Sequence, residues 1–202
     1  DAGGVFNPPL GVFGIGSTEV ESTYFFPGIT ATGNINIETA DSAIDMNVTA
    51  VTDILGNGKV DVAGNGDVIV IEEDGDLQIG LIRTASGNVF VGSVNGDIVD
   101  QDNDAQADVI GISITLIANQ GAIGSKENAI EINSSLPTIG LVTASAMDGI
   151  FLTEVDGDLN VGKITSKTGD VCLTAIRGDI LDGNNDDGAE TQGVSIPLLA
   201  RN

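Results

Sequence analysis

Two acidic loops hold the residues of this chain whose types and spacing could bind an ion. Each loop places oxygen-bearing side chains at positions 1, 3, 5 and 9 of a calcium-loop pattern. These are Asp100, Asp102, Asp104 and Asp108 in the first loop, and Asp182, Asn184, Asp186 and Glu190 in the second. Hard oxygen ligands at alternate positions can converge on one Ca²⁺ ion. The spacing therefore predicts two candidate calcium sites.

Both loops depart from the calcium pattern in two places. The sixth position, which the pattern fills with glycine, holds Ala105 or Asp187. The twelfth position holds Gly111 or Gly193, so the bidentate carboxylate is missing. Calcium binding at these loops should therefore be weak. A solvated acidic corner, which keeps a β-rich surface soluble, stays open as the alternative interpretation.

The acidic loops recur because the chain contains a long internal repeat. Residues 74–120 return at 156–202 without a gap, and 20 of these 47 aligned positions are identical. Repeat units of this kind stack on their neighbours, which favours building length and surface over forming one catalytic pocket. The repeat therefore indicates a scaffold rather than a catalyst.

Short segments that alternate in hydrophobicity at period two indicate strands rather than helices. Most begin or end at Gly, Asn or Asp, as in NINIE, KVDVA, DVIVI, NVFVG and DVCLT. About four coils of about 20 residues would fill one 82-residue repeat. We therefore predict an all-β fold, a parallel β-helix (solenoid) with about 20 residues per coil over residues 28–202.

The composition limits the partners of the chain. Seven Lys and Arg residues against 30 Asp and Glu residues give a formal net charge of −23. This charge would repel nucleic acid and anionic membrane surfaces, and it makes divalent cations the natural partners. Hydrophobic residues make up 41% of the chain but aromatic residues only 3%, which predicts an aliphatic core. No run approaches the roughly 18 apolar residues of a membrane span, so we expect no membrane insertion. The negative charge leads us to expect no nucleic-acid partner.

The two ends of the chain differ from the repeats. Residues 1–27 hold four of the six Phe residues and three of the five Pro residues. We interpret them as a cap over the first coil or as a docking segment for a neighbouring subunit, with the assembly residues Phe6, Phe13, Phe25 and Phe26. Near the other end, Pro197 replaces Thr115 of the first copy and removes a strand donor, as at an edge strand.

Alternation along the predicted strands separates a core face from an outer face. Val89, Val91, Ile114 and Leu116 should point inward, which turns Phe90 outward. By the same rule, an apolar stripe for lateral association would consist of Ile69, Phe90, Ile117 and Phe151. The alternative is that loops or the N-terminal segment cover these side chains.

Two stretches of the repeat resemble a known family. GDIVDQDNDAQADVIGISITLIANQGAIGSKENAIEI and GIFLTEVDGDLNVGKITSKTGDVCLTAIRGDILDG look like repeats of filamentous-haemagglutinin-like giant surface proteins of bacteria. The resemblance covers roughly residues 30–202 and rests on repeat texture rather than on a catalytic signature. It implies a right-handed parallel β-helix, secretion to the cell exterior and a role in adhesion or surface filaments.

These observations together lead to one expected function and one competing hypothesis. We expect an extracellular structural or adhesive β-solenoid of the bacterial cell surface. It would assemble with other copies of itself, head-to-tail or laterally, or continue into further repeats of a longer chain. The competing hypothesis is a β-helix protein that binds or degrades polysaccharide, with a host or neighbouring-cell surface glycan as partner. The chain has no His and its Lys and Arg residues are scattered, so we find no catalytic constellation and expect no enzyme.

Overall fold

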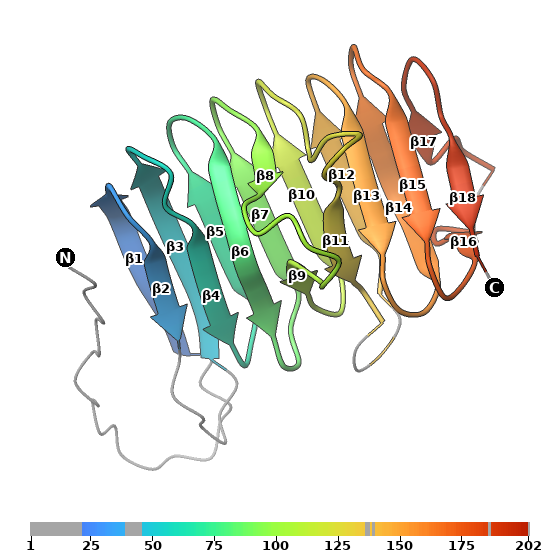
Figure 1. Ribbon diagram of the computed structural model, residues 1–202. Helices are drawn as coiled ribbons and strands as arrows, with labels where there is room; N and C mark the ends of the chain where they lie inside the picture. The colour runs from blue at the N-terminus through green and yellow to red at the C-terminus, as the bar shows by residue number, and fades with distance from the viewer. Residues whose placement is uncertain (1–21, 39–45, 136–137, 139, 186, 202) are drawn as a thin grey trace, which may run out of the picture.

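The computed structural model describes residues 22–38, 46–135, 138, 140–185 and 187–201. Within them the chain forms eighteen strands and no α-helix. The strands build a parallel β-solenoid of about seven turns with roughly 22 residues per turn (Figure 1). The predicted fold class is confirmed, and each coil pairs mainly with the coil before it and the coil after it.

The chain crosses from one sheet to the other at each half-turn. The first sheet stacks β1 (Ser22–Ala31), β3 (Met46–Ile54), β5 (Val68–Glu72), β7 (Val89–Ser93), β10 (Ile114–Ala118), β12 (Val142–Ala146), β14 (Leu159–Ser166) and β16 (Ile180–Asp182), with β17 (Thr191–Gln192) also on β14. The second sheet stacks β2 (Ile35–Glu38), β4 (Val60–Gly64), β6 (Leu77–Thr84), β9 (Val109–Ile110), β11 (Ile130–Asn133), β13 (Ile150–Glu154), β15 (Val171–Ala175) and β18 (Leu198–Ala200), with β8 (Ile98–Asp100) also on β6.

An aliphatic core fills the space between the two sheets. Val91 and Leu116 point inward and are fully buried, whereas Phe90 lies on the outer face and is half-buried, as the alternation predicted. Parallel pairing in register places like residues above one another, as in the buried column Val68, Val89, Ile114 and Val142. The core is therefore continuous along the described solenoid.

Polar side chains at one corner join successive coils. Asn47 Oδ1 accepts from the Asp67 backbone N–H at 2.8 Å, and Asp67 Oδ1 accepts from the Asn88 N–H at 2.7 Å. In the same way, Asn88 Oδ1 accepts from the Ser113 N–H, and Ser113 Oγ accepts from the Leu141 N–H. Asn and Asp are common at turns because their short side chains bond nearby backbone groups. Part of the acidity of the chain therefore has a structural use.

Hydroxyl groups at the ends of several strands also bond to the previous coil. Thr84 Oγ1 donates to Gly66 O at 2.5 Å and accepts from the Gly87 N–H at 3.1 Å. In the second copy, Ser166 Oγ donates to Asp148 O and accepts from the Gly169 N–H. Each hydroxyl thus satisfies two backbone groups that the turn would otherwise leave unpaired.

Glycines at another corner, between β7 and β8 and at its equivalent in the second copy, allow coils to approach closely. A Cβ on Gly96 would lie 2.2 Å from Gly75 O, and a Cβ on Gly178 would lie 2.2 Å from Gly157 O. Gly75 and Gly157 have φ values of 86° and 85°, in the left-handed region that favours glycine. These positions recur in both copies because any side chain there would push two coils apart.

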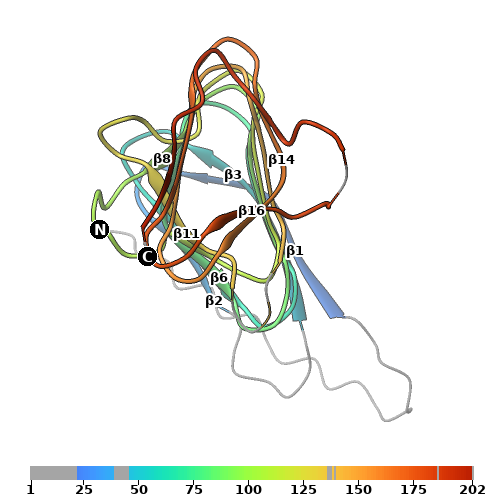
Figure 2. The same ribbon diagram turned by 90° about the vertical axis from the view of Figure 1, so that its right-hand side faces the viewer.

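The two copies of the repeat lie half a turn out of step. From β6 the chain passes through β9 and β11 to β13 in the second sheet, and the equivalent of β6 then lies in the first sheet, as β14. One repeat therefore spans three and a half coils rather than the four expected, because the corner loops lengthen some turns. In the end-on view of Figure 2, the loops that follow β8 and β16 accordingly lie on different sides of the solenoid.

The first and last strands of the described solenoid begin at positions that the sequence did not predict. β1 begins at Ser22, so the boundary placed after residue 27 falls inside the first strand. At the other end, β10 starts at Ile114 whereas its copy β18 starts only at Leu198. Pro197, which lacks an N–H, directly precedes this last strand of the second sheet.

Candidate metal centre

The structure separates the four aspartates of the first acidic loop into two pairs. Asp100 ends β8 and is 2% exposed, and Asp108 directly precedes β9 and is 4% exposed. Asp102 and Asp104 are exposed: Asp102 forms an ion pair with Lys59, and Asp104 Oδ1 accepts from the Gln106 N–H. The calcium-loop pattern therefore brings together its first and last members and leaves the middle two at the surface.

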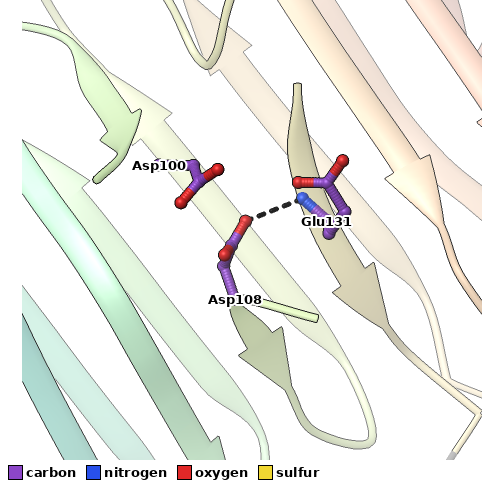
Figure 3. A group of neighbouring side chains, drawn as sticks. All are labelled: Asp100, Asp108 and Glu131. Atoms are coloured by element: carbon purple, nitrogen blue, oxygen red, sulfur yellow. Dashed lines mark hydrogen bonds between the residues drawn. The ribbon is translucent and has the colours of Figure 1, made fainter. Parts of the chain in front are cut away.

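Glu131 joins the buried pair from the neighbouring coil. One carboxylate oxygen each from Asp100, Asp108 and Glu131 lies within 4.8 Å of the others (Figure 3). Glu131 lies on β11, and its backbone N–H and carbonyl both bond to Asp108. Sequence reasoning missed Glu131 because its position beside the loop depends on the register between coils. The one available signal was an acid at an outward position of the next predicted strand.

Hydrogen bonds satisfy only part of this carboxylate cluster. Asp100 Oδ1 accepts from the Asp102 N–H at 2.8 Å, and Asp108 Oδ2 accepts from the Glu131 N–H at 2.9 Å. Asp100 Oδ2 and Glu131 Oε2 are buried and have no hydrogen-bond partner among the described residues. Buried polar atoms without partners are uncommon, so these two oxygens need an explanation.

Burial and mutual repulsion disfavour the charged forms of the cluster. Desolvation raises the pKa of Asp108 to about 9, and the nearby charge of Asp100 acts in the same direction. Desolvation also raises the pKa of Glu131 to about 7, again with a contribution from Asp100. At neutral pH, the three carboxyl groups alone would therefore hold at least one proton. A bound cation could replace that proton.

The second acidic loop forms the same turn but not the same cluster. Asp182 Oδ1 accepts from the Asn184 and Asn185 N–H groups, and Asn185 has a φ of 51° where Asn103 of the first copy has 47°. Asp182 and Asn184 are exposed and Glu190 is half-buried, and Asp186 lies outside the described residues. Among the described residues, no third carboxylate gathers with Asp182 and Glu190 as Glu131 does with Asp100 and Asp108.

Two buried glutamates at the ends of core strands were not predicted. Glu72 accepts from Thr52 Oγ1 and from the Ile54 N–H, each at 2.6 Å. Its copy Glu154 accepts from Ser134 Oγ at 2.6 Å and from the Ser134 N–H. Both are 0% exposed, and burial raises the pKa of both, that of Glu154 to about 7. They join one coil to the previous coil and have no access to a substrate.

The predicted outward apolar residues do not all share one face. Ile69 pairs with Phe90 in the first sheet, where Ile117 also lies, whereas Phe151 pairs with Cys172 in the second sheet. The Phe90 ring lies against Gly92, and the Phe151 ring lies against Gly149, so both rings are half-buried. The structure thus separates Phe151 from the other three members of the predicted stripe.

The predicted N-terminal assembly residues are only partly described. Phe25 is 60% exposed on β1, whereas Phe26 packs against the core. Phe6 and Phe13 lie outside the described residues. The exposed Phe25 is therefore the described member of this group that a partner could reach.

Comparisons with known proteins provide no further assignment. No protein-family model matches the chain, and no curated protein and no solved structure matches it. In the part of the chain that the structure describes, no helix has the length and apolarity needed to cross a membrane.

Proposed function

We propose that this chain is a structural segment of an extracellular bacterial surface protein, a β-solenoid that builds length and adds further coils at its C-terminal end. The stacking of similar coils along the whole described solenoid is the observation that supports this function. Leu198 on β18 continues the inward column of Leu173, yet Leu198 is 54% exposed whereas Leu173 is fully buried. A core-type side chain next to a free strand edge favours pairing with another coil.

A second copy of this chain is the partner that we propose for this end. Parallel pairing repeats through every turn of the described solenoid, with local register shifts in three strand pairs, so a further coil of the same kind would extend both the ladder and the core. The resemblance of the repeats to filamentous-haemagglutinin-like proteins supports a cell-surface location and a filamentous or adhesive role. Further repeats of a longer chain would cover the same end in the same way.

The structure gives less support to glycan cleavage. Paired catalytic carboxylates must reach the scissile bond, with separations of about 5–5.5 Å in retaining enzymes and about 6.5–9.5 Å in inverting enzymes. Asp100 and Asp108 are almost fully buried, and Glu72 and Glu154 point into the core. We therefore favour a scaffold over a polysaccharide-degrading enzyme.

Substitutions on the two faces of β18 test the proposed assembly. Leu198→Asp places a charge in the uncovered core column, and Leu199→Asp places the same charge beside it on the outer face, where Leu199 pairs with Thr174. We expect the wild-type chain and Leu199→Asp to form elongated particles as concentration rises, and Leu198→Asp to remain monomeric. Light scattering coupled to size exclusion, with electron microscopy, measures this. A wild-type chain that stays monomeric, or equal assembly of both variants, would contradict self-assembly through this end.

A further inference from the structure

Three carboxylates converge at the place where the first acidic loop leaves and rejoins the second sheet. Asp100 lies before the loop, Asp108 after it, and Glu131 on the next coil (Figure 3). One oxygen from each lies within 4.8 Å of the other two. We propose that Asp100, Asp108 and Glu131 bind one Ca²⁺ ion, which fixes the loop at residues 101–107 to the coil that carries β11.

The unpartnered oxygens carry this proposal. Asp100 is only 2% exposed, and its Oδ2 has no hydrogen-bond partner among the described residues. The buried Oε2 of Glu131 also has no hydrogen-bond partner among the described residues. Both oxygens belong to carboxylates of the cluster, so a cation bound there would supply the interaction that hydrogen bonds do not.

No positive side chain neutralises the cluster within the described parts of the chain. None of the ion pairs found there includes Asp100, Asp108 or Glu131. Lys59, the cation whose pKa responds to Asp100, is bonded to Asp102 instead. Several carboxylates that are buried together need either protons or a cation, and a divalent ion compensates two charges at once.

The donor set and the spacing favour calcium among divalent cations. All three ligands are hard carboxylate oxygens, which suit Ca²⁺ and Mg²⁺, and the chain contains no His, the usual ligand of zinc and copper sites. The three oxygens lie within 4.8 Å of one another, a spacing that Ca²⁺ can bridge because its ligands lie at about 2.3–2.6 Å in flexible geometry. Mg²⁺ demands near-ideal octahedral geometry at about 2.0–2.1 Å and usually keeps several waters, so it fits an all-carboxylate protein site less well.

Hydrogen bonds between the two coils hold the three ligands in place without the ion. Asn128 Nδ2 donates to Asp100 O at 2.8 Å, which ties the end of β8 to the segment that leads into β11. The Asp108 N–H donates to Glu131 O at 2.8 Å, and the Glu131 N–H donates to Asp108 Oδ2 at 2.9 Å. Such a preorganised site loses little conformational entropy on binding.

Calcium titration of the full chain tests the site. After chelator treatment, isothermal titration with CaCl₂ should show one site in the wild-type chain, and saturating Ca²⁺ should raise its Tm by about 5 °C or more. Asp108→Asn and Glu131→Gln should each weaken binding at least tenfold. Asp182→Asn changes the residue of the second copy that is equivalent to Asp100 and should leave binding unchanged.

The calcium-free variants separate ligation from a purely structural role. Because Asp108→Asn replaces a buried carboxyl group, whose charged form is disfavoured, by an uncharged amide of similar shape, the calcium-free variant should melt at or above the Tm of the calcium-free wild type but gain no Tm from CaCl₂. The proposal is overturned by a wild-type chain that neither binds Ca²⁺ nor gains Tm, and equally by an Asp182→Asn variant that weakens binding as much as Asp108→Asn. MgCl₂ binding as tight as CaCl₂ binding would overturn the choice of calcium.

Discussion

Acidic side chains in this solenoid have three different environments. Asp67 and its equivalents bond the next coil at the corners, Asp102 lies at the surface beside Lys59, and Glu72 and Glu154 are buried at the ends of core strands. The buried glutamates cost stability because burial disfavours their charged form. Their hydrogen bonds to Thr52 and Ser134 offset part of this cost.

Glu154 should make the folded state less stable as pH rises from about 4.5 to about 7. Burial raises its pKa to about 7 from the ordinary value of 4.5, so the folded state binds more protons than the unfolded state between these values. Its contribution is therefore full below the unfolded pKa and is lost as pH rises through the folded pKa. Glu154→Gln stays neutral and should lose about 2 kcal/mol less stability between pH 5 and pH 8 than the wild type.

Urea unfolding followed by circular dichroism at these two pH values measures the difference. Glu73→Gln removes one carboxylate from an exposed position and serves as the control. We expect this variant to show the same pH dependence of stability as the wild type. If Glu154→Gln and the wild type lost equal stability, Glu154 would not be the titrating group.

The corners, rather than the strands, decide how closely successive coils can stack. Strands supply the ladder and the core, but every half-turn must also satisfy its backbone groups and let two chains pass. The side-chain ladder from Asn47 to Leu141, the hydroxyls of Thr84 and Ser166, and the glycines at 96 and 178 solve these two problems.

Gly96→Ala should destabilise the solenoid by about 2–3 kcal/mol. The added Cβ would lie 2.2 Å from Gly75 O, a backbone atom of the previous coil that cannot rotate away. Gly33→Ala is the control, because no atom lies within 4 Å of its added Cβ. Chemical denaturation of both variants measures the difference. Equal stability of the two variants would contradict the requirement for glycine at this corner.

At the scale of the whole molecule, net charge opposes the proposed assembly. Each chain carries a formal charge of −23, so two copies repel each other as their ends approach. Apolar contact through Leu198 and in-register hydrogen bonds must overcome this repulsion.

Salt should therefore promote assembly of the wild-type chain. Raising the ionic strength from about 0.01 M to about 1 M shortens the Debye length from about 30 Å to about 3 Å, which screens the repulsion between copies. We expect the mean particle mass from light scattering to rise with NaCl for the wild type and to stay monomeric for Leu198→Asp. A particle mass that falls with salt would mean that ion pairs, rather than apolar stacking, hold the copies together.

The sequence by itself determined the fold class, the inward residues and the repeated corners. Strand alternation at Val89 and Val91 and the recurrence of Gly96 as Gly178 are local or periodic signals, and stacking preserves them. The turn at Asp100 and Asp182 was likewise visible as a repeat.

Only the tertiary structure decided which acids meet and which apolar residues share a face. Glu131 reaches Asp108 through the register of two coils, which depends on the length of every corner between them. The same corner lengths place the two repeat copies half a turn apart, so Phe151 lies on the opposite sheet from Phe90. Alternation fixes whether a side chain points in or out, but the position around the axis accumulates from all preceding loops, and no local pattern encodes that sum.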